Sequence, residues 1–225
     1  MPLAWLALLV AVLPFAVVQL CYAVSVLAGL IPGCIPYLTG CTSISAAGRH
    51  GASYFIFKGG MIPSAVLLAL YWILCRRWLL ALGARDSAAV RSMVVIGIVS
   101  GAFLALYAVY LGSKGDFYNF MRRFGVTVHL SFALLAQILL IREITRLPER
   151  AHARVPRGVR RGKLAVVGAL LGLGLLSIPV GNFMPDKDRA QNVIEWTFAT
   201  LMLGYYAFTW RAWQATGFRA EFGVR

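Results

Sequence analysis

Six apolar runs divide this chain, and each is long enough to cross a lipid bilayer as a helix. The runs cover about residues 3–30, 60–80, 92–112, 125–144, 163–184 and 192–213, with shorter polar segments between most of them. A membrane-spanning α-helix needs about 20 consecutive apolar residues, and a helix satisfies its own backbone hydrogen bonds inside lipid. The pattern therefore predicts one all-α domain over residues 1–225, a polytopic membrane bundle of six transmembrane helices.

The composition argues against a soluble domain and against a nucleic-acid-binding protein. Hydrophobic residues make up 60% of the chain and charged residues 13%, and the mean hydropathy is +0.76. Soluble domains are nearer 45–50% apolar and about 25% charged. A net charge of +14 would favour nucleic acid in a soluble protein, but here the basic residues lie at the ends of apolar runs. There they set orientation and contact anionic headgroups, so the expected partners are membrane lipids.

Lysine and arginine are unevenly distributed between the two sides of the predicted bundle. One side has 15 of them, in the segments after the second and fourth runs and in the C-terminal tail that ends at Arg225. Eight of these fall between Arg142 and Lys163, whereas the opposite side has only 7. Because cytoplasmic segments are enriched in Lys and Arg, both termini are predicted to be cytoplasmic. The segment 31–58 is then predicted to face outward.

Two further patterns predict how the helices pack. Gly168-x-x-x-Gly172 in the fifth run permits close helix approach and is expected to pack within the bundle. Tryptophans near the cytoplasmic ends of the second and sixth runs are expected to form an interfacial aromatic belt: Trp72, Trp78, Trp210 and Trp213.

The cysteines allow one disulfide. Cys34 and Cys41 lie in the outward segment, where an oxidising environment permits a bridge; the alternative is two free thiols. Cys21 and Cys75 lie in spans and are expected to be packing residues. The chain has no CxxC pair and no zinc-ligand spacing, so no metal site and no cofactor is predicted.

Two ionisable residues lie near the outer ends of spans. His129 is close to the start of the fourth run and Glu195 to the start of the sixth, at the same predicted depth. Ionisable groups inside a membrane are costly and usually face the bundle interior. The functional interpretation is a shared polar site. The alternatives are a packed, hydrogen-bonded histidine and an interfacial carboxylate stabilised by a helix N-terminus.

The outward segment also carries a dense polar stretch between Cys41 and His50. Arginine can hold a phosphate with two hydrogen bonds, and serine hydroxyls can add more, so this chemistry fits a lipid headgroup. The alternative is a solvated loop. The candidate headgroup-binding residues, with the two ionisable residues included, are Ser43, Ser45, Arg49, Lys58, Arg123, His129 and Glu195.

Three stretches resemble the FRAG/DRAM/SFK superfamily of six-span membrane proteins, which includes the DRAM autophagy modulators and a post-GPI-attachment factor of lipid remodelling. The first stretch runs from Pro36 through Ser43-Ile-Ser-Ala-Ala-Gly48 to Phe57, the second is Val128-His129, and the third is Glu195-Trp-Thr197. The order of the stretches and the predicted topology agree with that family. The resemblance implies a six-span fold and a role in lipid handling.

The chain departs from the family pattern at a few positions. Thr42 replaces the usual proline before the Ser-Ile-Ser match, and Leu130 follows His129 where some relatives carry an acidic residue. The compact loops and the arginine-rich make-up indicate a bacterial member in the inner (cytoplasmic) membrane. A role in GPI-anchor or autophagy biology is therefore not implied.

Three functions are consistent with the sequence. The first is binding, presentation or remodelling of a phospholipid or glycolipid at the outward leaflet. The second is acyl transfer or hydrolysis, with His129 as general base, Glu195 orienting it, and Ser43 or Ser45 as nucleophile. The third is a structural or regulatory adaptor without a pocket. A site that pairs His129 with Glu195 would favour the first two.

Overall fold

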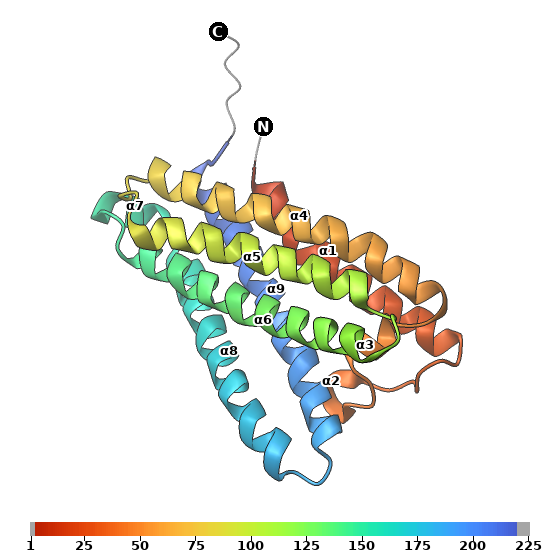
Figure 1. The fold of residues 1–225 in the computed structure, drawn as a ribbon. Helices are drawn as coiled ribbons and strands as arrows, with labels where there is room; N and C mark the ends of the chain where they lie inside the picture. The colour runs from red at the N-terminus through yellow and green to blue at the C-terminus, as the bar shows by residue number, and fades with distance from the viewer. Residues whose placement is uncertain (1–2, 220–225) are drawn as a thin grey trace.

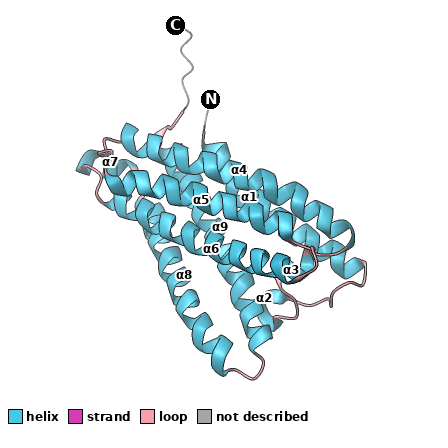
Figure 2. Cartoon of the chain, in the orientation of Figure 1, coloured by secondary structure: helices cyan, strands magenta, loops and turns pink. Residues whose placement is uncertain are grey.

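The computed structural model describes residues 3–219, and the regular elements of that part of the chain are nine α-helices (Figures 1 and 2). The predicted all-α fold is confirmed. Residues 1–2 and Arg225, one of the basic residues counted above, lie outside the described residues. Six helices are long: α1 (Ala4–Leu27), α4 (Gly51–Ala81), α5 (Ala88–Tyr110), α6 (Asp116–Thr145), α8 (Arg157–Phe183) and α9 (Lys187–Thr216). Three are short: α2 (Pro36–Thr39), α3 (Ile44–Ala47) and α7 (Glu149–Arg154).

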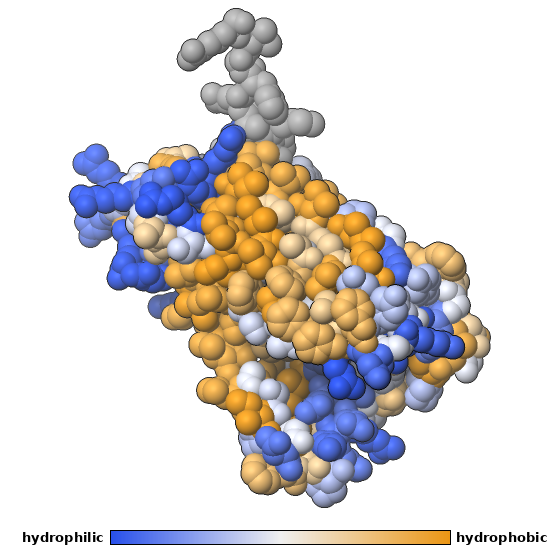
Figure 3. Space-filling model, in the orientation of Figure 1, coloured by the Kyte–Doolittle hydropathy of each residue, from blue (hydrophilic) through white to orange (hydrophobic). Residues whose placement is uncertain are grey.

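Five of the long helices, α1, α4, α5, α6 and α8, are both long and apolar enough to cross a membrane. Figure 3 shows apolar surface over the middle of the molecule, with hydrophilic residues gathered toward its two ends. Helix α9 has 30 residues, the same length as α6, but hydroxyl and tyrosine side chains interrupt its apolar sequence. The structure thus confirms the character of a multi-pass membrane protein.

The helices form a bundle from which one hairpin diverges. Helices α1, α4, α5 and α6 pack in that order, each against the next along the series, and α9 packs on α1 and α8. Helix α8 touches α6 near the end of the bundle that carries α7, and the α8–α9 pair then leans away from α6 toward the opposite end (Figure 1). We call the end that holds α2 and α3 the outer end, and the end that holds α7 the basic end.

The predicted outward loop is shorter than the sequence indicates. Helix α4 begins at Gly51, so Lys58 lies inside a helix, and α2 and α3 occupy part of the segment before it. Ser53 in the first turn of α4 is buried: its Oγ donates to the Cys21 carbonyl oxygen over 3.1 Å and lies 2.8 Å from Ser25 Oγ. These bonds satisfy the Ser53 hydroxyl inside the bundle.

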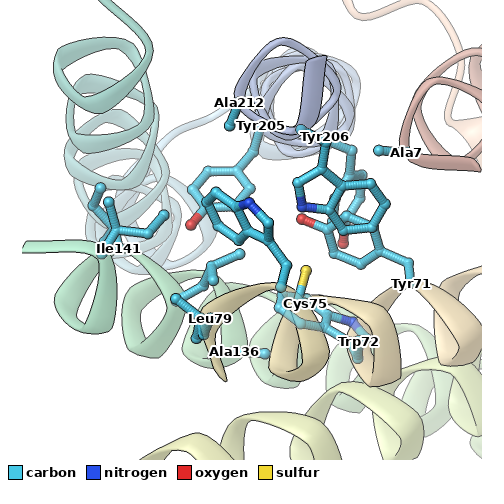
Figure 4. Packing of buried hydrophobic residues seen from close by; sticks show 14 of the residues in the cluster. Ala7, Tyr71, Trp72, Cys75, Leu79, Ala136, Ile141, Tyr205, Tyr206 and Ala212 are labelled. Carbon is cyan, nitrogen blue, oxygen red and sulfur yellow. The ribbon is translucent and has the colours of Figure 1, made fainter. Parts of the chain in front are cut away.

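Large aromatic side chains pack among aliphatic ones such as Leu79 and Ile141 in the core of the basic half of the bundle (Figure 4). Trp72, Trp78 and Trp213 are at most 1% exposed, so the prediction of an interfacial belt is wrong for these three. The Trp78 indole donates to Thr216 Oγ1 over 2.9 Å. An indole with an internal acceptor can be buried without the cost of an unsatisfied donor, and α9 supplies that acceptor.

The same core contains Lys163, which the sequence places among the basic residues between two spans. Its side chain is fully buried. The ammonium donates to Thr209 Oγ1 over 2.6 Å and to the Tyr205 carbonyl oxygen over 3.4 Å, and it lies 3.4 Å from the centre of the Tyr205 ring. Thr209 Oγ1 is also 2.7 Å from the Tyr71 hydroxyl. A basic residue at the end of an apolar run is therefore used here as an internal polar contact between α8 and α9.

Close helix approach occurs at glycines other than those predicted. A Cβ atom at Gly168 or Gly172 would meet nothing within 4 Å, so the prediction that this pair packs within the bundle is wrong. A Cβ at Gly97 of α5 would instead overlap the indole of Trp72. Helices α4 and α5 approach each other at this position because Gly97 leaves room for the tryptophan.

Candidate functional site

A cavity of about 90 Å³ lies inside the bundle and extends from its outer half toward the middle. Side chains from α1, α3, α4, α5, α6 and α9 line it. Its walls are mainly apolar: Val10, Pro14, Val18, Ile44, Phe57, Met61, Leu68, Leu104, Val126, Leu130, Ala199, Met202 and Leu203. Five polar residues interrupt that lining: Ser64, Tyr107, His129, Glu195 and Tyr206. A cavity needs only about 10–15 Å³ to hold one water, so this one accommodates a larger guest.

His129 is fixed by one serine on the neighbouring helix. Its Nδ1 lies 3.0 Å from both the Oγ and the carbonyl oxygen of Ser100, and Ser100 Oγ donates to the His129 carbonyl oxygen over 3.0 Å. Ser100 is fully buried. These contacts occupy Nδ1, and no hydrogen bond among residues 3–219 involves the other ring nitrogen, Nε2.

Glu195 lines the same cavity from α9. Its carboxyl group lies near the backbone N–H of Ile44, at the start of α3. The next residue, Trp196, is 1% exposed, and its indole donates to the Thr42 carbonyl oxygen over 2.9 Å. His129 and Glu195 both line this cavity, and no direct hydrogen bond joins them among the bonds of residues 3–219.

The roof of the cavity is the segment 31–50. It is closed by the Cys34–Cys41 disulfide, whose Cα atoms are 6.5 Å apart, so the predicted bridge is confirmed. The Tyr22 hydroxyl of α1 donates to the Cys34 carbonyl oxygen over 2.6 Å and accepts from the Cys34 N–H over 2.8 Å. Asn192 of α9 donates to the Gly40 carbonyl oxygen over 2.8 Å. The roof is thus attached to both α1 and α9.

Gly40 has a structural reason to be glycine. Its φ is +59°, in the left-handed region, where it ends α2. A Cβ there would also overlap the backbone of Arg189. The roof can therefore lie against the start of α9 only with glycine at this position.

The two candidate serines support the roof. Ser43 is the N-cap of α3, and its Oγ accepts from the Ala46 N–H over 3.1 Å, which is the usual role of an N-cap hydroxyl. Ser45 Oγ lies 2.7 Å from the hydroxyl of Tyr107, which does line the cavity. Neither serine is among the lining residues.

The candidate basic residues are placed differently from one another. Arg49 lies close enough to Glu195 for electrostatic interaction, and its Nε is buried without a hydrogen-bond partner. Lys58 instead donates to the Tyr54 hydroxyl over 2.5 Å and lies over that ring, outside the cavity lining. Arg123 is exposed. Its neighbour Arg122 is the one that interacts electrostatically with Arg49 and Tyr107.

The floor of the cavity is a pair of bonds between α6 and α9. Gln137 donates through Nε2 to the Met202 carbonyl oxygen over 3.2 Å, and the Tyr205 hydroxyl donates to the Gln137 carbonyl oxygen over 2.7 Å. Gln137 lies two helical turns beyond His129, toward the basic end. The cavity therefore occupies the interval between this floor and the roof.

The sequence did not single out Ser100, Tyr107 or Gln137. Each is an ordinary polar residue in or beside an apolar run, and the two partners of each contact are far apart in the chain. Taken together, the arrangement provides an apolar chamber lined by the Glu195 carboxyl group, the His129 imidazole and tyrosine hydroxyls, with arginines beyond it.

Comparisons with protein-family models, with curated proteins and with solved structures each found no match to this chain.

Proposed function

We propose that the protein spans the bacterial inner membrane six times, with both termini in the cytoplasm and the disulfide-bonded roof outside. The uneven distribution of basic residues supports this orientation. A disulfide is also expected on the oxidising side. Helix α9 is the sixth span in this proposal because it runs the full length of its partner α8 in an antiparallel hairpin.

Cysteine labelling on intact cells tests this topology. The native cysteines do not interfere, because two are bonded and Cys21 and Cys75 are buried. A cysteine at Leu38, which is 76% exposed, should react with a membrane-impermeant maleimide. Cysteines at the exposed positions Arg150 and Gln214 should react only after permeabilisation. Labelling of Gln214→Cys in intact cells would mean that α9 does not cross.

With this topology, the protein handles a phospholipid or glycolipid of the outward leaflet. The observation that carries the proposal is the cavity, because it joins an apolar chamber to Glu195 and His129 at one end of the bundle. An acyl segment fits the apolar walls, and a headgroup would meet the carboxyl group and the nearby Arg49. Ligand sites usually have this composition, largely apolar with a few convergent polar groups.

The resemblance to the FRAG/DRAM/SFK superfamily is part of this proposal. Its three stretches are separated by about 70 and 65 residues along the chain. All three nevertheless contribute to the lining of one cavity, the first through Ile44 and Phe57, the second through His129 and the third through Glu195. Convergence of those stretches on a ligand-sized space supports a common lipid-handling role.

The hydrogen bonds of the serine hydroxyls near the cavity favour lipid binding or presentation over acyl transfer. Ser43 and Ser45 are engaged in the roof. Ser64, which does line the cavity, donates to the Gly60 carbonyl oxygen of its own helix over 2.8 Å. A serine nucleophile needs a base within hydrogen-bond reach, and none of these three hydroxyls is bonded to His129. Ser100 does lie 3.0 Å from His129 Nδ1, but its hydroxyl donates to the His129 carbonyl oxygen, and the side chain is fully buried and outside the cavity lining.

Native mass spectrometry of the gently purified protein, with lipidomics, tests the lipid proposal. Wild-type protein should retain a lipid. Glu195→Gln, which keeps the shape of the side chain, and Ala199→Phe, which fills the chamber, should each lower retention about tenfold, since the loss of one charged hydrogen bond costs about 1.5–3 kcal/mol. Glu149→Gln, at an exposed acid on α7, is the matched control and should behave as wild type. Equal retention by all four proteins would leave the adaptor function as the better account.

A further inference from the structure

We propose that a groove at the basic end binds the phosphate of an anionic phospholipid from the adjoining leaflet. The groove encloses about 290 Å³ between the end of α6, α7 and the start of α8. Its polar lining is His152, Arg157, Arg160 and Arg161, with Thr145 at the edge. The groove lies at the opposite end of the molecule from the cavity of the proposed function, so either assignment can fail without the other.

The positive charges in the groove have no acidic partner. In the part of the chain between residues 3 and 219, ion pairs join Arg76 and Arg91 to Asp86, and Arg142 to Glu143. None involves an arginine of the groove. Arg160 Nη1 lies 2.7 Å from His152 Nδ1, and Arg160 Nε is buried without a hydrogen-bond partner. Buried guanidinium N–H groups without an acceptor are costly, and an anion in the groove would supply one.

Helix α8 adds a second reason for an anion at this place. It starts at Arg157, has no side-chain cap and has no acidic residue in its first turn. The N-terminus of a helix carries a partial positive charge and free N–H groups, which favour anions and disfavour cations. The first five residues of α8 include three arginines, whose positive charges interact unfavourably with the positive end of the helix dipole. An anion bound between these arginines and the helix N-terminus would offset that repulsion.

An exposed face of α8, formed by apolar residues and glycines, continues from the groove. This face favours a lipid over free phosphate as the ligand. Leu164, which lines the groove, is 61% exposed. Gly168 and Gly172 follow on the same helical face at intervals of four residues, and a Cβ at either would meet nothing within 4 Å. Leu175, at 69% exposure, continues that face. An acyl chain can lie along this exposed face of α8, over the two glycines, while its phosphate is held by the arginines.

The test uses the full-length protein in nanodiscs of phosphatidylcholine mixed with phosphatidylglycerol, delipidated stepwise and analysed by native mass spectrometry. The wild type should retain one phosphatidylglycerol in preference to phosphatidylcholine. Arg160→Gln/Arg161→Gln should weaken that retention roughly 25-fold, since each basic residue contributes about fivefold. The control Arg146→Gln/Arg150→Gln removes the same charge from the same basic segment outside the groove lining and should change retention less than threefold. Equal losses in the two double variants would overturn the site and leave only general electrostatic attraction.

A third variant distinguishes lipid from free phosphate. Gly168→Phe places a bulky side chain on the exposed face where the acyl chain would lie, without altering charge, and the open space around this position means that the fold should tolerate it. It should lower retention of phosphatidylglycerol about tenfold. Inorganic phosphate in excess should compete weakly with wild-type retention. If Gly168→Phe has no effect and inorganic phosphate displaces the lipid completely, the groove is a free-phosphate site and the lipid assignment is wrong.

Discussion

A leucine in place of Gly97 should lower the free energy of unfolding by about 3 kcal/mol, the upper end of the usual range for overpacked cores. The side chain would have to enter the space of the Trp72 indole, which is fully buried. Trp72 in turn packs edge-on against Tyr71 and Tyr206, so it cannot move aside without disturbing α9. The expected result is a less stable protein in which α4 and α5 are forced apart.

Cooperative unfolding in mixed micelles, followed by tryptophan fluorescence, measures the effect. Gly174→Leu is the matched control, because a Cβ there would meet nothing within 4 Å. Both substitutions gain about 1 kcal/mol of helix propensity, so the difference between them isolates the packing cost. Similar stability for the two variants would mean that the α4–α5 interface adapts, and that Gly97 is not required for the approach of the helices.

Thr209→Val should destabilise the protein by about 2–3 kcal/mol, the usual cost of removing a hydrogen bond to a charged group. The substitution keeps the shape of the side chain but removes the closest acceptor of the Lys163 ammonium. What remains is the Tyr205 carbonyl oxygen and ring. A buried cation with too few acceptors is more costly than no cation at all.

A sharper test is whether Lys163→Met compensates for the loss of stability caused by Thr209→Val. Lys163→Met alone should change stability by less than about 1 kcal/mol, because replacing a buried charge by an apolar chain of similar length is often neutral. In the double variant, Lys163→Met should recover more than half of the loss caused by Thr209→Val. Thr216→Val, which removes the acceptor of Trp78, should not be rescued by Lys163→Met. Additive effects of Lys163→Met and Thr209→Val would show that the ammonium does not depend on this hydroxyl.

Much of the architecture follows from hydropathy alone. Each of the six long helices contains all or most of one apolar run, because a run of that length leaves few alternatives in lipid. Short-range features such as the Cys34–Cys41 bridge, seven residues apart, were also predictable as allowed pairings. The position of His129 and Glu195 at one depth followed from counting residues along two helices that run in the same direction.

Features that depend on helix rotation could not be predicted from the pattern. The hydrophobic residues surround each helix, so periodicity does not say which face is inward, and tryptophans that look interfacial were assigned to the wrong environment. The burial of Lys163 could not be predicted either, because its partners, Thr209 and Tyr205, are more than 40 residues away in the chain. Arg122 and Arg123 are neighbours in sequence, and only the rotation of α6 decides which of them faces Arg49.

The attachment of the roof to α9 has a kinetic consequence. Asn192 and Trp196 hold the carbonyl oxygens of Gly40 and Thr42, so the roof cannot lift away from the cavity without breaking these bonds. Helices α6 and α9, by contrast, touch only sparsely, and the bonds of Gln137 join them at the floor. We therefore expect guests to exchange sideways between these two helices, through hydrocarbon and not through water. Occupancy would then follow the mole fraction of the guest in the membrane, and its concentration in the aqueous phase would have no direct influence.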